Sequence, residues 1–270
     1  MYLPRHNTGR ARLIFTSLFL ALSVLMVPMQ TKAQVAAPAA APAKPRTMVA
    51  LVFGQSNAAN FGESRHTSVT NVFVFHDGRL IQPAADPLPG SNGEGGSVWT
   101  RLGDRLIAQK LYDRVVFVPS AIGGTEIARW APGGDLHPLL LKNIDDATRS
   151  GLKFTHLLWH QGESDAVLGT SGADYKALFM AMLASIRAHG VDAPVFVSVA
   201  TRCGQYPPDW RIERAQLELV NPELGIFPGP NTDWLGPWYR HDGCHLSNRG
   251  LELHADMWVT VLKAHAILTQ

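Results

Sequence analysis

Short, almost continuous apolar runs alternate along the chain with longer stretches in which apolar residues recur every three or four positions. The runs have the length of buried strands, and the longer stretches have the spacing of amphipathic helices. The predicted strands are 48–53, 72–76, 115–119, 154–159 and 195–199. The predicted helices are about 98–111, 137–149, 172–188, 209–219 and 247–267. Such alternation is typical of a parallel sheet covered on both faces, so we predict an α/β fold with three layers and a mostly parallel five-stranded sheet.

The N-terminal pattern differs from the rest of the chain. Residues 1–33 begin with a basic segment, continue with an apolar run from Leu13 to Met29, and end on the small-residue sequence Thr31-Lys32-Ala33. This order predicts a signal peptide that is removed on export. The apolar run is close to the length that spans a bilayer, so an uncleaved anchor is the alternative. Pro28 and the small residues favour cleavage, a periplasmic or secreted protein, and no stable membrane insertion afterwards.

The remaining chain divides into a linker and one domain. Residues 34–46 are rich in alanine and proline, which predicts an extended linker. Residues 47–270 have the length of one ordinary domain and show no internal repeat.

Charge excludes one class of partner. The net charge of the whole chain is +2, but residues 1–33 hold four basic residues and no acidic one, so the chain without them has a net charge of −2. Nothing in this balance indicates binding to nucleic acid.

Polar segments follow three of the predicted strands. The first, Gly54-Gln55-Ser56-Asn57, comes directly after the strand 48–53. A strand that ends in a tight turn can hold a serine hydroxyl at the sheet edge, where a nucleophile must lie. The alternative is that Ser56 caps a helix.

The second and third segments could supply hydrogen-bond donors. Gly123-Gly124, within the segment 120–130, could turn backbone N–H groups toward a ligand, or could simply form a turn. Gln161, within the segment 159–165, could donate its amide to an oxyanion, or could fix a loop. Glu163 could serve as a buried structural carboxylate.

The fourth segment, His241–Ser247, precedes the last predicted helix. Asp242 and His245 are three positions apart, so a bend between them would let the carboxylate reach one imidazole nitrogen while the other faces a serine. An alternative is a zinc site formed by His241, Cys244 and His245. No second ligand motif occurs elsewhere in the chain, which disfavours it.

Together the four segments resemble the SGNH hydrolase superfamily, and more closely its branch of sialate O-acetylesterases and the acetylxylan esterases of carbohydrate esterase family 6. The matching blocks are GQSN, GGT with a tryptophan following, HQGE and DGxH, in this order. The resemblance implies a flavodoxin-like SGNH hydrolase fold, with Ser56 as nucleophile, His245 as base and Asp242 as its carboxylate partner. It also implies an oxyanion hole made by the N–H groups of Ser56 and Gly124 and the Gln161 amide, and no metal or organic cofactor. Glu163 remains a possible alternative acid.

Several other residues keep two interpretations. Arg129 and Trp130 could border the substrate, or could be a surface arginine and a core tryptophan. Trp234, Trp238 and Tyr239, just before the fourth segment, have the same ambiguity. Cys203 and Cys244 could form a disulfide, or could be two unpaired buried thiols.

Together with the N-terminal pattern, the resemblance implies an exported serine esterase that removes acetyl groups from a carbohydrate or polysaccharide through an acyl-enzyme. One alternative is a polysaccharide O-acetyltransferase of the same fold. The other is a catalytically silent polysaccharide-binding module.

Overall fold

The computed structural model describes residues 45–268. The expected signal peptide and most of the expected linker lie outside the described residues. Arg46, which the sequence assigns to the linker, already belongs to the folded domain, because its backbone N–H donates to Asp113 Oδ2 at 2.8 Å. No helix among residues 45–268 is both long and apolar enough to span a membrane.

A mixed sheet forms the middle layer, with the strand order β3-β2-β4-β1-β5-β6-β7. All neighbouring strands are parallel except β2 and β3, which form an antiparallel hairpin. The strands are β1 (Thr47–Gly54), β2 (Val72–His76), β3 (Arg79–Ile81), β4 (Arg114–Ala121), β5 (His156–His160), β6 (Val195–Val199) and β7 (Ile226–Asn231).

The sheet thus has seven strands in residues 45–268, so the prediction of five was wrong, whereas the mostly parallel α/β fold is confirmed. The two missed strands are the two edges. β3 has only three residues, all exposed, so it is too short to show a strand pattern even though Leu80 and Ile81 are apolar. β7 contains Pro228, Gly229 and Pro230, residues that argue against a strand. An edge strand tolerates proline because its outer N–H groups need no partner.

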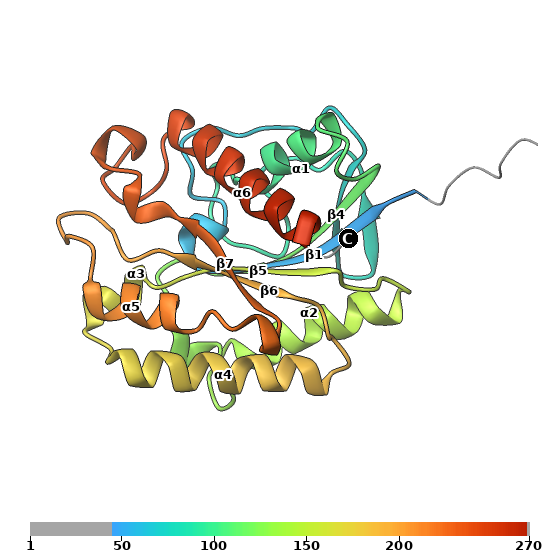
Figure 1. The fold of residues 1–270 in the computed structure, drawn as a ribbon. Helices are drawn as coiled ribbons and strands as arrows, with labels where there is room; N and C mark the ends of the chain where they lie inside the picture. Colours follow the sequence, from blue (N-terminus) through green and yellow to red (C-terminus); the bar gives the residue numbers. More distant parts are fainter. Residues whose placement is uncertain (1–44, 269–270) are drawn as a thin grey trace, which may run out of the picture. The chain divides into compact units, whose positions relative to one another are not determined.

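Helices cover both faces of the sheet (Figure 1). One face carries α1 (Trp99–Ala108) and α6 (Asn248–Leu268). The other face carries α2 (His137–Arg149), α4 (Gly172–Ala188) and α5 (Trp210–Glu218), together with the short helix α3 (Glu163–Leu168) that the sequence did not predict. Six residues are too few to show a helical period.

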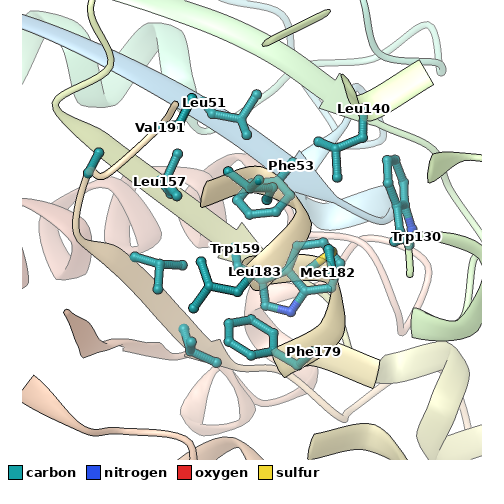
Figure 2. Packing of buried hydrophobic residues seen from close by; sticks show 14 of the residues in the cluster. Leu51, Phe53, Trp130, Leu140, Leu157, Trp159, Phe179, Met182, Leu183 and Val191 are labelled. Carbon is teal, nitrogen blue, oxygen red and sulfur yellow. The ribbon is translucent and has the colours of Figure 1, made fainter. Parts of the chain in front are cut away.

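Aromatic side chains fill the core on the second face (Figure 2). Phe53 of β1 packs against Trp159 of β5 with ring centroids 4.7 Å apart, and Phe179 of α4 lies 6.2 Å from Trp159. These contacts fix the central strands against the helix layer, so the loops that follow the strands start from a rigid base.

The register of the three central strands determines where the polar segments meet. Gly54, the last residue of β1, pairs with Ala121 of β4 on one side and with His160 of β5 on the other. The three strands therefore end at one level, and the chain that follows each of them emerges at the same sheet edge. Open α/β folds bind their ligands at this edge.

Candidate active site

A cavity of about 490 Å³ lies at the carboxyl ends of the central strands. Ser56, Gly124 and His245 line it, although they come from three segments far apart in sequence. Phe61 and Leu168 give it an apolar wall. A slightly larger cavity, of about 540 Å³, lies between α4 and residues 222–225 and contains none of the residues predicted to act in catalysis.

The turn after β1 holds Ser56 in a fixed position. Gly54 adopts a φ of +133°, and a Cβ there would lie 2.0 Å from the carbonyl oxygen of His160, so only glycine fits. The Gln55 N–H donates to the same carbonyl at 3.1 Å. Gln55 Oε1 accepts the N–H of Ser164 at 3.0 Å. The serine therefore stands at the start of a short 3₁₀ turn that is bonded to the β5 segment, and its side chain faces the cavity.

The two glycines of the second segment differ in what their N–H groups do. The Gly123 N–H donates to Asn92 Oδ1 at 2.8 Å, so it is already engaged. No acceptor within residues 45–268 takes the N–H of Gly124, which also lines the cavity. A Cβ at Gly123 would lie 2.7 Å from the Phe61 ring and 3.3 Å from Ser56 Cβ, so this glycine lets the loop approach the serine closely.

Gln161 does not occupy the position that the sequence predicts. Its side chain is fully buried, and its amide group donates to the Thr125 carbonyl at 3.0 Å and to Asp165 Oδ2 at 2.5 Å. Gln55 Oε1 is a third acceptor, at 3.2 Å, so the two amide hydrogens face three acceptors of the protein interior and none is left for an oxyanion in this arrangement. Gln161 instead links the second and third loops, which corresponds to its loop-fixing interpretation.

His245 and Asp242 form a close pair. His245 Nδ1 lies 2.6 Å from Asp242 Oδ2, and Asp242 Oδ1 accepts the backbone N–H groups of His245 at 2.7 Å and Cys244 at 2.9 Å. Partial burial raises the pKa of Asp242, but these hydrogen bonds outweigh burial and lower the pKa to about 2. The carboxylate is therefore ionised at any ordinary pH and can fix the imidazole orientation.

An aromatic contact also holds the ring of His245. This ring stacks on Phe61 with ring centroids 5.1 Å apart. His245 lines the same cavity as Ser56, but no hydrogen bond joins Ser56 Oγ to the imidazole in the described structure. Such contacts commonly tighten only when substrate is bound.

Glu163, the alternative acid, contacts other partners. Its Oε1 accepts from Asn57 Nδ2 at 2.9 Å and lies 3.4 Å from His160 Nε2. Burial raises the pKa of Glu163, but its contacts with His160 and Asn57 outweigh burial and lower it overall. The structure gives Glu163 no contact with His245, so its position is that of a buried structural carboxylate.

Asn57 connects the serine turn to the loop that carries the histidine. Besides donating to Glu163, its Oδ1 accepts the N–H of Leu246 at 3.3 Å. This link joins positions 189 residues apart, so no local sequence signal could reveal it. Asn92, which accepts from Gly123 31 residues away, and Asp165, which accepts from the N–H of Ile127 38 residues away, were missed for the same reason.

Cys203 and Cys244 form a disulfide. It joins the connection after β6 to the loop that carries His245, and the N–H of Gly204 donates to the Gly243 carbonyl at 3.1 Å beside it. The bond also removes the thiolate that the alternative zinc site required. His241, Asp242 and His245 do place one potential ligand atom each within 4.8 Å of one another, so a metal bound there would compete for the groups of the His–Asp pair.

The disulfide gives a first prediction. The bridged cysteines are 41 residues apart, and a loop of that size should stabilise the fold by about 4 kcal/mol in the chain-entropy account. We expect the double substitution Cys203→Ser with Cys244→Ser to lower the free energy of unfolding by about that amount in urea titrations. The unmodified protein should show no free thiol when denatured without reductant. Two titratable thiols under those conditions would contradict the bridge.

Neither Arg129 nor Trp130 is among the residues that line the cavity, and their positions correspond to the interpretation as a surface arginine and a core tryptophan. Arg129 Nη2 pairs with Asp135 Oδ2 at 2.6 Å on the surface. Trp130 is fully buried in the core, where its Nε1 donates to Thr125 Oγ1 at 2.9 Å (Figure 2). The block that contains them carries an apolar packing residue rather than a sugar platform.

The comparison with known families agrees with this geometry. Residues 46–228 match the family described as carbohydrate esterase, sialic acid-specific acetylesterase. The chain belongs to this family. The resemblance drawn from the four sequence blocks is therefore confirmed, and the chain is a member of a family of carboxylic ester hydrolases.

Individual relatives of this carbohydrate esterase are distant. A probable carbohydrate esterase from Arabidopsis thaliana is 33% identical over 106 residues, which cover 38% of this chain and 39% of the relative. The solved structure of that plant protein superposes with a TM-score of 0.66 at 18% identity, covering 81% of this chain and 98% of the other. A structure described as a novel carbohydrate acetylesterase from Xanthomonas citri gives a TM-score of 0.51 at 19% identity, covering 80% and 56%. These structures show that the fold is shared.

Proposed function

We propose that this carbohydrate esterase is an exported serine hydrolase that removes acetyl groups from a carbohydrate or polysaccharide. The observation that carries the proposal is the cavity lined by both Ser56 and His245, whose imidazole is paired with Asp242 at 2.6 Å. A serine, a histidine and an ionised carboxylate are the groups that nucleophilic acyl transfer needs. Membership of the family supports the choice of an acetylated carbohydrate.

The first half-reaction transfers the acetyl group to the enzyme. Ser56 Oγ attacks the ester carbonyl carbon while His245 Nε2 takes the hydroxyl proton, and Asp242 stabilises the imidazolium that forms. The carbonyl oxygen becomes an oxyanion. We assign the Ser56 and Gly124 N–H groups as its donors, since the Gln161 amide is engaged elsewhere. Collapse of this intermediate breaks the bond to the sugar oxygen, and His245 returns its proton to the leaving hydroxyl.

Water completes the second half-reaction. His245 removes a proton from a water molecule that attacks the acetyl-serine, and then returns this proton to Ser56 Oγ as acetate leaves. None of these steps requires a group that the chain does not itself provide.

Export is the remaining part of the proposal. The basic, apolar and small-residue segments of residues 1–33 support it. The Cys203–Cys244 disulfide supports it independently, because such bonds persist mainly in oxidising compartments such as the periplasm or the extracellular space. Detection of the protein outside the cytoplasm with an N-terminus near residue 34 would test both.

Acyl-chain length tests the esterase assignment. We expect p-nitrophenyl acetate to be hydrolysed with a kcat/KM at least about tenfold above that of p-nitrophenyl octanoate, because the family to which the chain belongs is described as acetylesterases. Acetate release from acetylated xylan or another acetylated polysaccharide, followed by an enzymatic acetate assay, should accompany this preference. Faster turnover of octanoate would point to a lipase or thioesterase instead.

A further inference from the structure

Two exposed tryptophans lie just before the loop that carries His245. Trp238 is 88% exposed and Trp234 is 78% exposed, the highest values of any aromatic side chain in residues 45–268. Four of the seven tryptophans are fully buried, as is usual for so large a side chain in a folded domain. Neighbouring exposed aromatic residues commonly mark a binding surface. The proposed acyl transfer uses neither of them.

Their exposure does not come from a loose loop. Thr232 and Asp233, directly before Trp234, are buried, and so is Leu235 directly after it. The Asp233 carboxylate accepts the backbone N–H groups of Thr201 and Arg202, each at 2.8 Å. The backbone on both sides of Trp234 is thus anchored to the protein interior while the indole is exposed. The aromatic surface is therefore held in place before a ligand binds.

Arg240 joins this segment to the catalytic loop. Its buried guanidinium donates to the carbonyls of Thr232 and Leu235, each at 2.9 Å, and also to the carbonyl of Cys244. Because one side chain bonds both stretches, the tryptophan-bearing turns and the loop of His245 form one rigid unit.

Trp238 is also close along the chain to the loop that carries His245. The His241 N–H donates to the His245 carbonyl at 2.9 Å, and the Ser247 N–H donates to the Tyr239 carbonyl at 2.8 Å. Trp238 precedes His241 by three residues, and three residues of chain can span at most about 11 Å. A polymer seated on Trp238 would therefore lie beside the loop that carries His245.

We propose that Trp234 and Trp238 form a sugar-binding rim that holds the residues of a polysaccharide chain next to the acetylated residue in the cavity. The proposal rests on the carbohydrate esterase function proposed above and specifies its substrate class as a polymer rather than an acetylated monosaccharide. The flat apolar face of an indole packs against the C–H face of a pyranose, and its N–H edge can donate to a hydroxyl. The two side chains carry no charge, so binding should depend only weakly on salt.

Kinetics on substrates of two sizes test the rim. For the polymer hydrolysed fastest among acetylated xylan, glucomannan and pectin, the double substitution Trp234→Ala with Trp238→Ala should raise KM about tenfold with little change in kcat. The double substitution should lower kcat/KM for the polymer about tenfold more than it lowers kcat/KM for p-nitrophenyl acetate. Trp238→Phe, which keeps an aromatic ring, should recover part of the effect of Trp238→Ala.

Trp210 provides a matched control. It is another exposed tryptophan, at 68%, but it lies at the start of α5 and lines a separate hollow with Lys176 and Arg214. Trp210→Ala should leave KM for the polymer unchanged. A similar rise in KM for Trp210→Ala would show that the effect follows from losing any surface tryptophan, and would overturn the proposal.

A binding measurement separates the rim from catalysis. The full chain carrying Ser56→Ala should be retarded in native gels that contain the same polymers after chemical deacetylation, and the two tryptophan substitutions should abolish the retardation. Because this experiment needs no hydrolysis, it succeeds or fails independently of the esterase assignment. Equal migration of the Ser56→Ala protein with and without the two tryptophan substitutions would overturn the proposal. So would tryptophan-dependent sedimentation with phosphatidylethanolamine–phosphatidylglycerol vesicles without any effect of the polymers, since that result would identify a membrane-binding surface.

Discussion

Replacing Ser56 with alanine should reduce the hydrolysis of p-nitrophenyl acetate by about 10³-fold or more while leaving the protein folded. The expected loss is large because Ser56 is the group that accepts the acetyl in the proposed reaction, and water alone reacts slowly with an ester. The side chain is small and sits at the cavity wall, so its removal should not disturb the hydrogen bonds that Gln55 and Asn57 make around the turn. Circular dichroism and thermal unfolding would check the fold.

Ser164 offers a matched control for this change. It lines the same cavity, and its only described role is to donate its backbone N–H to Gln55 Oε1 at 3.0 Å, a bond that alanine preserves. Ser164→Ala should therefore retain activity of the same order as the unmodified protein. Near-normal turnover by a folded Ser56→Ala protein would remove Ser56 from the reaction.

The second large effect concerns the carboxylate that serves His245. Asp242→Asn should lower kcat by up to about 10⁴-fold, because an amide can neither stabilise the imidazolium nor hold the imidazole in the tautomer that accepts the serine proton. The pKa of Asp242 is lowered to about 2 by its hydrogen bonds, so this carboxylate stays charged as the pH falls until the medium is strongly acidic. Its own protonation therefore does not limit activity near neutral pH. The remaining activity of Asp242→Asn should rise toward alkaline pH.

Glu163→Gln is the comparison that decides between the two carboxylates. Glutamine keeps an oxygen that can accept from Asn57 but loses the charge that faces His160. We expect a modest fall in kcat and a loss of about 1–3 kcal/mol in the free energy of unfolding, since a buried ionised hydrogen-bond acceptor is weakened. If Glu163→Gln proved the crippling change and Asp242→Asn the mild one, Glu163 would be the partner of His245 and Asp242 would only shape its turn.

The fold could be predicted where the hydrophobic pattern within a single strand identifies that strand. The five central strands could be predicted from their almost continuous apolar runs, because most of their residues are buried between two helical layers. The edge strand β7 could not be predicted in this way. Its position at the edge of the sheet allows Pro228 and Pro230, which a central strand would exclude. β3 has only three residues, which is too few for a hydrophobic pattern to identify a strand.

The same distinction applies to the site. The Asp242–His245 contact spans three residues and could be predicted from its spacing. The direction of the Gln161 amide could not be, because it depends on Thr125 and Asp165, which only the folded chain brings together. Trp130 was ambiguous for a similar reason, since its burial depends on α2, α4 and the sheet packing around it.

The central claim is that Ser56 becomes acylated, and covalent labelling tests it most directly. The protein would be treated with an active-site-directed organophosphate such as diethyl p-nitrophenyl phosphate, digested, and sequenced by mass spectrometry. We expect one diethylphosphoryl group per chain, located on Ser56. Esterase activity should fall in proportion to labelling. The Ser56→Ala protein should not be labelled. Complete inactivation with the adduct on another residue, or persistent activity after Ser56 is fully modified, would contradict the central claim.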